Sequence, residues 1–367
     1  MAALLLLWSR SAGAQSPGAS LILPAAEAAR IVPAGARELS LDLESVAGLF
    51  ESQSSREGSP GFRLKLSATL RRALSGALSI FDPPPAPPVS GPRRPDHRTL
   101  WVTAGALAVV PVVGALSWWR FERTPFHVDP EGWFGEDTYA GGADKASHFV
   151  VSYTGTRLLS GAYRKLGNSP GEANWKAAGV VALSGVLVEV GDGTAHYGFS
   201  WSDIGMDVLG AFAGVGIEAA GIQDLVGFRF AYVGAEKPPS AAEDTGPGTD
   251  YSREMYTMDF KLSGAMRRLN WRPGVSRFLL FSLTYGSKGY RYSPPELRER
   301  NVGLELGLNL PEVLRAARVP ETRWWGRALI TFFEFVRLPF TGIGYQYDLN
   351  HGRWHGPTAG NAYDPGP

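Results

Sequence analysis

The stretch LWVTAGALAVVPVVGALSWW, residues 100–119, is twenty residues long and has no charged side chain. Arginine precedes it at Arg93, Arg94 and Arg98, and Arg120 follows its closing pair of tryptophans. This length, with basic and aromatic flanks, is typical of a helix that crosses a bilayer. The stretch therefore predicts a transmembrane helix over 100–119, with a buried core helix as the alternative.

The first fourteen residues have features of an export signal. Residues 3–8 are apolar, and Ala-Gly-Ala at 12–14 has the small-x-small form of a cleavage site. A cleaved signal would place the start of the 100–119 helix outside the cytoplasm. The arginines before that helix would instead keep this side in the cytoplasm. The two patterns conflict, so the topology stays open.

Composition narrows the class of protein. The net charge of +1 gives no basic face for nucleic acid, so no nucleic-acid partner is expected. The sequence has no cysteine, which excludes disulfides, thiolate chemistry and cysteine-ligated zinc. The 45 glycines and 11 tryptophans favour close helix packing and interfacial aromatics. We expect membrane lipid as a partner, and the sequence identifies no protein partner.

The region before the apolar stretch has little periodicity and ends in the proline-rich run at 83–88. Within it, Phe62, Leu66, Leu70, Leu74 and Leu78 recur at four-residue steps between basic residues. This spacing predicts either an amphipathic helix on a membrane surface or a partly ordered tail.

Three further helices are expected at 144–165, 176–190 and 202–222. The last has Gly210 and Gly214 in the small-xxx-small spacing that lets another helix approach closely. Each helix is shorter or more polar than a clear membrane span, so each could pack beside the first.

The sequence pattern changes from mainly helical to partly strand-like after residue 227. Residues 278–285, 302–310 and 342–349 alternate or run apolar with tyrosine and glycine, which predicts strands. Residues 324–336 resemble a helix with an aromatic face.

The expected fold is mainly α. It is a membrane-associated bundle of about four helices with a smaller C-terminal β-containing (α+β) module. The expected parts are a signal peptide at 1–14, a low-order region at 15–98, a helical core at 99–227, a linker at 228–252, an α+β module at 253–356 and a disordered tail at 357–367.

The expected helices bring carboxylates into apolar surroundings. Asp144 and His148 lie four residues apart and so share a helix face. Glu189 and Asp192 fall at the end of the second helix, and Asp203 opens the third. Ser200 or Ser202 can cap that third helix, and Asp203, Asp207, Gly210 and Gly214 then form one stripe along it.

Buried charges must pair, neutralise or bind an ion, because an unpaired charge in a low dielectric costs several kcal/mol. We hypothesise that Asp144, His148, Glu189, Asp192 and Asp203 converge. They could then form a structural polar network, a ligand or divalent-metal site, or a catalytic acid–base cluster. Lys145 and Arg157 could offset part of their charge. The metal is unknown, and no cofactor follows from the sequence.

Other catalytic templates do not fit. The sequence has no phosphate-binding loop, nucleophile elbow or His-Glu-x-x-His motif. We interpret His196, in the loop 193–199, as a surface histidine.

Several motifs together resemble the YfiM-like family, whose members are predicted periplasmic proteins or lipoproteins. The motifs are Trp-Trp at 118–119 with Pro-Phe-His at 125–127, ADKASHF at 143–149, EVGDG at 189–193 and GFSWSD at 198–203. The likeness extends more weakly to about residue 350. Members typically have asparagine where Asp207 stands here, and no lipobox cysteine is present, so lipid anchoring does not carry over.

The family has no established activity. Its Asp-Lys-x-x-His, Glu and Ser-x-x-Asp pattern is faintly similar to VanZ-like membrane proteins and, more distantly, to lipid phosphatases, whose phosphate-clamping arginines the pattern lacks. The resemblance implies an uncharacterised protein of the cell envelope, membrane-associated and on the periplasmic side. We expect a non-enzymatic structural or binding role. The alternative is a membrane-embedded hydrolase or lipid-handling enzyme that uses the His/carboxylate cluster with or without a metal, so whether the chain is an enzyme stays open.

Overall fold

The structure is a computed structural model that describes residues 97–116, 119, 123–232, 251, 254–272, 274–290 and 294–359. The expected signal peptide, the segment at 62–78, most of the linker at 228–252 and most of the tail at 357–367 lie outside the described residues.

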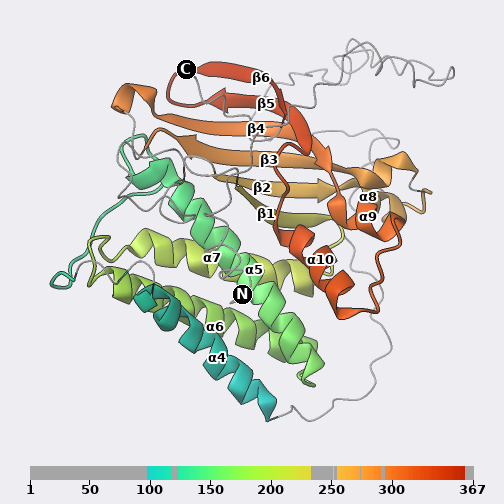
Figure 1. Cartoon of the computed structure of the whole chain (residues 1–367), viewed down its shortest axis with the longest axis horizontal. Helices are drawn as coiled ribbons and strands as arrows, with labels where there is room; N and C mark the ends of the chain where they lie inside the picture. The colour runs from blue at the N-terminus through green and yellow to red at the C-terminus, as the bar shows by residue number, and fades with distance from the viewer. Residues whose placement is uncertain are drawn as a thin grey trace, which may run out of the picture. The chain divides into compact units, whose positions relative to one another are not determined.

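The described chain forms an α+β fold (Figure 1). Its helices are α4 (Arg98–Leu116), α5 (Ala143–Lys165), α6 (Pro170–Asp192), α7 (Trp201–Ala219), α8 (Leu262–Arg268), α9 (Leu310–Ala316) and α10 (Trp324–Phe335). Its strands are β1 (Val226–Tyr232), β2 (Glu254–Lys261), β3 (Leu279–Lys288), β4 (Glu299–Leu308), β5 (Gly342–Asp348) and β6 (Arg353–Ala359).

The expectation of a mainly α protein is therefore corrected, because one sheet contains six strands in the part of the chain that the structure describes. The helices expected at 144–165, 176–190, 202–222 and 324–336 are present as α5, α6, α7 and α10, and the three expected strands are β3, β4 and β5. The strands β1, β2 and β6 were missed. The polar residues that alternate with apolar ones in β1 and β2, such as Arg229 and Asp259, are buried. Neither strand therefore has the exposed polar face that a strand pattern in sequence usually indicates.

The sheet is an antiparallel meander in which every strand pairs with its sequence neighbour, in the order β1-β2-β3-β4-β5-β6. Leu283 on β3 lies opposite Leu304 on β4, which in turn lies opposite Tyr345 on β5. At the other side of the sheet, Phe230 of β1 forms an isolated parallel bridge with Val336, just after α10.

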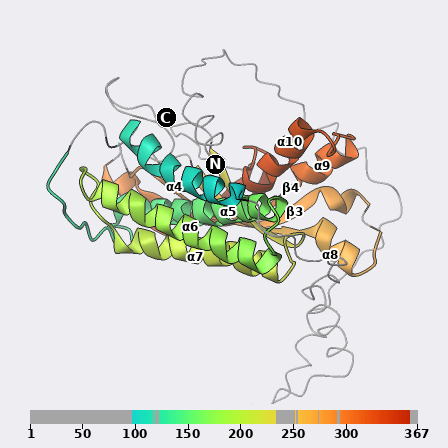
Figure 2. The ribbon, with the colours of Figure 1, turned by 90° about the horizontal axis from the view of Figure 1, so that it is seen from below.

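The four helices α4–α7 lie on the β1 side of the sheet (Figure 1) and run beside one another (Figure 2). Helix α5 contacts both α6 and α7 and also touches β1, β2 and β3, whereas α4 packs on α6. Tyr153 of α5 joins the two layers, because its buried ring meets Phe228 of β1 and Phe335 of α10 edge to face. The helical layer and the sheet thus share one core.

Local sequence signals explain where two of these helices begin. The Ser169 side chain accepts a hydrogen bond from the Glu172 amide, and Pro170 occupies the first turn of α6, where its missing N–H costs nothing. Ser200 caps α7 by accepting from the Asp203 amide, which selects Ser200 over Ser202 as the cap. The capping pair explains why α6 begins six residues before the expected start at 176.

Among the described residues, the helices α4 and α6 are long and apolar enough to cross a membrane. Only 11% of the α4 window is buried within the protein, against 44% of the α6 window. Core helices of soluble proteins also have this length and composition, so the transmembrane helix at 100–119 stays a prediction.

Helix α7 approaches α5 through glycine. A β-carbon at Gly210 would lie 2.1 Å from the carbonyl oxygen of Phe149, and one at Gly214 would lie 3.1 Å from the Thr156 side chain. The small-xxx-small spacing therefore serves the α5–α7 contact.

Gly210→Ala should destabilise the protein by about 1–3 kcal/mol, because the added methyl group must push the two backbones apart. The matched control is Gly216→Ala on the same helix, where a β-carbon meets nothing within 4 Å. Since alanine favours helix over glycine, the control should be neutral or stabilised by up to about 1 kcal/mol. Denaturant unfolding in detergent measures both, and equal stability of the two variants would contradict the close packing.

Candidate functional site

A buried lysine joins three carboxylates at the start of α5. The Lys145 ammonium lies 2.6 Å from Asp144 Oδ2, 2.5 Å from Glu131 Oε2 and 2.8 Å from Asp203 Oδ1. Lys145, Asp144 and Asp203 are almost fully buried. These ion pairs connect α5 to the N-terminus of α7 and to the loop that carries Glu131.

His148 lies one helical turn further along α5 and points at carboxylates from two other helices. Its Nδ1 is 3.1 Å from Asp207 Oδ2, and its Nε2 is 3.9 Å from both Glu189 Oε1 and Asp203 Oδ1. The His148 side chain is 21% exposed, so one side of the cluster opens outward. The ring is therefore held by Asp207 while its other nitrogen faces Glu189 and Asp203.

Hydrogen bonds orient the carboxylates around this histidine. Ser152 donates to Asp207 Oδ1 at 2.6 Å, and the Ser200 amide donates to Glu189 Oε2 at 2.9 Å. A β-carbon at Gly185 would lie 2.3 Å from Asp207 Oδ2, so glycine on α6 makes room for the Asp207 carboxylate. We call the set Glu131, Asp144, Lys145, His148, Ser152, Glu189, Asp203 and Asp207 the polar cluster.

Burial and mutual charge shift the protonation of the polar cluster. Burial raises the pKa of Glu131 and of Glu189 to about 8, against the opposing charges of Lys145 and His148 respectively. Burial would lower the pKa of His148, but Asp207 and Asp203 outweigh it and raise the pKa well above its usual value. The pKa of Asp203 is lowered because His148 and Lys145 together outweigh its burial. These shifts favour the protonated forms of Glu131, Glu189 and His148 at neutral pH.

Four of the five candidate residues converge: Asp144, His148, Glu189 and Asp203. The fifth, Asp192, accepts a hydrogen bond from the Trp119 indole at 2.6 Å, and its charge contributes to the raised pKa of Glu189. Arg157, expected to offset the cluster's charge, instead pairs with Glu218 at 2.9 Å. His196 is exposed, in agreement with its interpretation as a surface residue. What role the converging residues play stays a prediction.

Four cluster members were not among the five candidates: Lys145, which was expected only to offset their charge, and Asp207, Ser152 and Glu131. Asp207 and Ser152 were visible as members of helix stripes, Asp207 four residues after Asp203 and Ser152 four after His148. Glu131 lies in a loop without periodicity, and no sequence pattern connects it to Lys145 fourteen residues later.

Two groups in the polar cluster have the spacing of metal ligands. One ligand atom from each of His148, Glu189 and Asp203 lies within 4.8 Å of the others, and the same holds for Glu131, Asp144 and Asp203. Lys145 already contacts all three members of the second group. The His148 group is therefore the better candidate for a cation.

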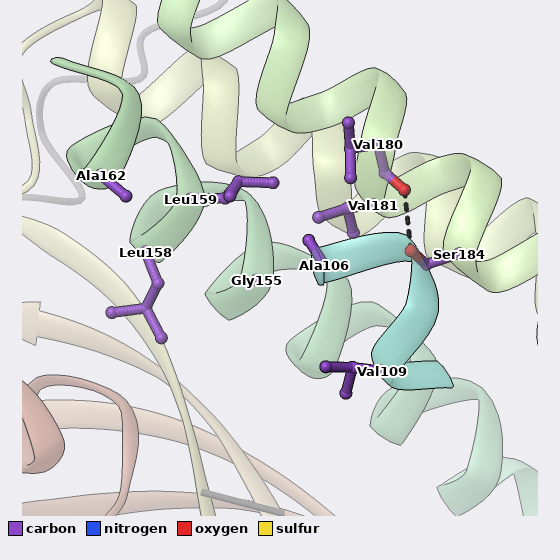
Figure 3. A pocket seen from close by; sticks show the side chains of 9 residues that line it. All are labelled: Ala106, Val109, Gly155, Leu158, Leu159, Ala162, Val180, Val181 and Ser184. Carbon is purple, nitrogen blue, oxygen red and sulfur yellow. Dashed lines mark hydrogen bonds between the residues drawn. The ribbon is translucent and has the colours of Figure 1, made fainter. Parts of the chain in front are cut away.

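An apolar pocket of about 190 Å³ lies elsewhere, between α4, α5 and α6 (Figure 3). Aliphatic side chains such as Val109, Leu158 and Val181 line it. The hydroxyl of Ser184, which also lines the pocket, donates a hydrogen bond to the Val180 carbonyl. No member of the polar cluster lines this pocket.

The chain is an α+β protein with a buried histidine–carboxylate cluster where the helices α5, α6 and α7 meet. Residues 130–218 match the model of a family described as predicted periplasmic lipoprotein (DUF2279), a family of unknown function. The match includes the motifs at 143–149, 189–193 and 198–203, and with them the whole polar cluster. No curated protein and no solved structure matches the chain.

The match confirms the expected location in the cell envelope, on the periplasmic side. It also confirms a resemblance to an uncharacterised periplasmic family. The narrower YfiM-like assignment and the similarity to VanZ-like proteins stay predictions.

Lys145→Met should destabilise the protein by about 3–5 kcal/mol, because it leaves buried carboxylates without their counter-charge. Lys165→Met is the matched control, since Lys165 is exposed at the C-terminal end of the same helix, α5. It should change stability little. Unfolding monitored by circular dichroism compares them, and a stable Lys145→Met protein would show that the cluster does not hold the helices together.

Proposed function

We propose that this chain is a membrane-associated envelope protein with a binding role, and that it binds a divalent cation at His148, Glu189 and Asp203. The observation that carries the proposal is the convergence of three ligand atoms within 4.8 Å, one each from α5, α6 and α7. A cation bound there would hold the three helices together, a role that requires no catalysis.

The chemistry of the ligands supports this proposal. One imidazole with two carboxylates suits Mn, Zn or Fe. Histidines that bind metals usually give their second ring nitrogen to a carboxylate, which fixes the ring, and Asp207 lies 3.1 Å from His148 Nδ1. His148 Nε2 is then the nitrogen left for a cation.

Membrane association is supported by α4. Leu100, Trp101 and Val112 on this helix are all exposed, and its window of membrane length is mostly unburied. An apolar helix that packs on the protein along one side only needs another apolar neighbour, and envelope lipid supplies one. Of the two long apolar helices in the described chain, α4 and not the half-buried α6 enters the membrane in this proposal.

Zn²⁺ or Mn²⁺ should raise the melting temperature of the wild-type protein in detergent and bind stoichiometrically by elemental analysis. A cation at 100 times its dissociation constant stabilises the folded state by about 2.7 kcal/mol. His148→Ala and Asp203→Asn should lose both effects, whereas His196→Ala, at an exposed loop histidine, should keep them.

If His148→Ala binds the cation as well as His196→Ala does, the proposed site is wrong. Well-folded wild-type protein that binds neither ion would also contradict the proposal, and would leave the polar cluster as a structural network.

The affinity for the cation should rise with pH. Binding requires a neutral His148 and an ionised Glu189, but His148 has a raised pKa and that of Glu189 is about 8. Protons therefore compete with the cation below these values, and affinity should increase as pH rises through about 8. Calorimetric titrations in two buffers of different ionisation enthalpy would measure the protons released. Affinity independent of pH would contradict displacement of these protons.

A membrane hydrolase is the second candidate, and the outward opening at His148 favours it. Catalytic metal sites keep three protein ligands and an open position for water. The opening at His148, 21% exposed, would admit that water. An arginine to clamp a phosphate is missing among the hydrogen-bond and ion-pair partners described for the polar cluster, so phosphate esters are the less favoured substrates.

A further inference from the structure

The middle of the sheet carries an apolar outer face. Neighbouring side chains on β3, β4 and β5 form two rows across the strands: Leu283, Leu304 and Tyr345 in one, and Phe281, Leu306 and Ile343 in the other. With Leu308, these seven residues are between 41% and 55% exposed, and none is charged. We call them the outer face.

On the opposite face of the sheet, buried polar side chains come from β1 to β4 and from the segment after α10. On this face, Asp259 pairs with Arg229 and accepts a hydrogen bond from Ser282 at 2.6 Å. Glu305 pairs with Arg337, and all five of these side chains are at most 3% exposed. The ionic groups are thus inside and the aliphatic groups outside.

In water the opposite arrangement is favoured, with apolar side chains inside and charged side chains outside. A one-residue slip of a strand moves every side chain to the other face, so the register of β3–β5 determines which set is exposed. In water, each exposed leucine forgoes the benefit of burial, and each buried ion pair loses hydration. Apolar side chains outside and polar ones inside are the pattern of strands that face lipid.

We infer that the outer face of β3–β5 contacts the hydrocarbon of a lipid bilayer. The face is apolar and uncharged, which matches acyl chains. The envelope location and the exposed, apolar helix α4 on the same molecule make lipid available to it.

Lipid explains more than a second copy of the chain would. A second copy of the chain would account for the apolar patch. It would not account for the ion pairs that are buried on the opposite face of the sheet. The described sheet also ends at β6, whose outer backbone groups need water. Trp354 and Arg353 on β6 are both exposed, and this pair of residue types is typical of the membrane–water interface. We therefore place β6 at the interface and β3–β5 at greater depth.

Single cysteines test the depth, because the sequence contains none of its own. In the full chain reconstituted into phosphatidylcholine vesicles, Leu304→Cys and Ile343→Cys would each carry a small environment-sensitive fluorophore. Glu296→Cys, at an exposed position outside the strands, is the control. Nitroxides on the acyl chains should quench positions 304 and 343 several-fold more than 296, and aqueous iodide should show the reverse order.

Iodide quenching at 304 and 343 as strong as at 296 would place the outer face in water and overturn the inference. Shielding from both quenchers, together with disulfide formation between two copies at 304, would assign the face to a second copy instead. Circular dichroism checks the fold of each variant, and Ile343→Cys carries the test if a label at 304 disturbs it.

Discussion

The buried charge of Lys145 constrains the helical half of the molecule. Its ammonium meets Asp144, Glu131 and Asp203 within 2.8 Å, and a buried ion is tolerated only when its partners arrive from the right directions. Asp144 adjoins it on α5, but Asp203 requires the cap of α7 to sit against α5. That closeness in turn requires glycine at 210, where the α7 backbone meets the carbonyl of Phe149. The ion pairs and the glycine contact therefore support one another.

The same preference for polar groups inside recurs in the sheet. Arg337 reaches Glu305 from the segment after α10, and a β-carbon at Gly342 would collide with its guanidinium. In both halves of the described chain, glycine gives a buried charged group the room that it needs, as Gly185 does for Asp207. Apolar side chains are left to face outward from β3–β5 and from α4. In the membrane setting that we propose, the burial of apolar side chains contributes less to stability, and the ionic contacts then carry more of the specificity.

Much of the helical half could be predicted from sequence, because helix periodicity and caps are local. The Asp144–His148 spacing, the Ser200 cap and the Gly210–Gly214 pair all have the predicted local geometry. Glu131 could not be predicted, since its contact with Lys145 depends on how a loop folds back over α5. The hydrogen bond from Trp119 to Asp192 could not be predicted either, because the position of Asp192 at the end of α6 says nothing about Trp119. The sheet was underestimated because β1 and β2 alternate apolar residues with buried polar ones.

Asp203 connects the two parts of the polar cluster. The same oxygen, Oδ1, lies 2.8 Å from Lys145 Nζ and 3.9 Å from His148 Nε2. A cation at the proposed site would draw on this oxygen and weaken its attraction for Lys145, which would then depend more on Glu131 and Asp144. Burial raises the pKa of Glu131 to about 8, against the charge of Lys145, so the ionisation of this carboxyl group depends on how strongly Lys145 attracts it. Cation binding at His148 would thus be felt at Glu131, on the far side of Lys145.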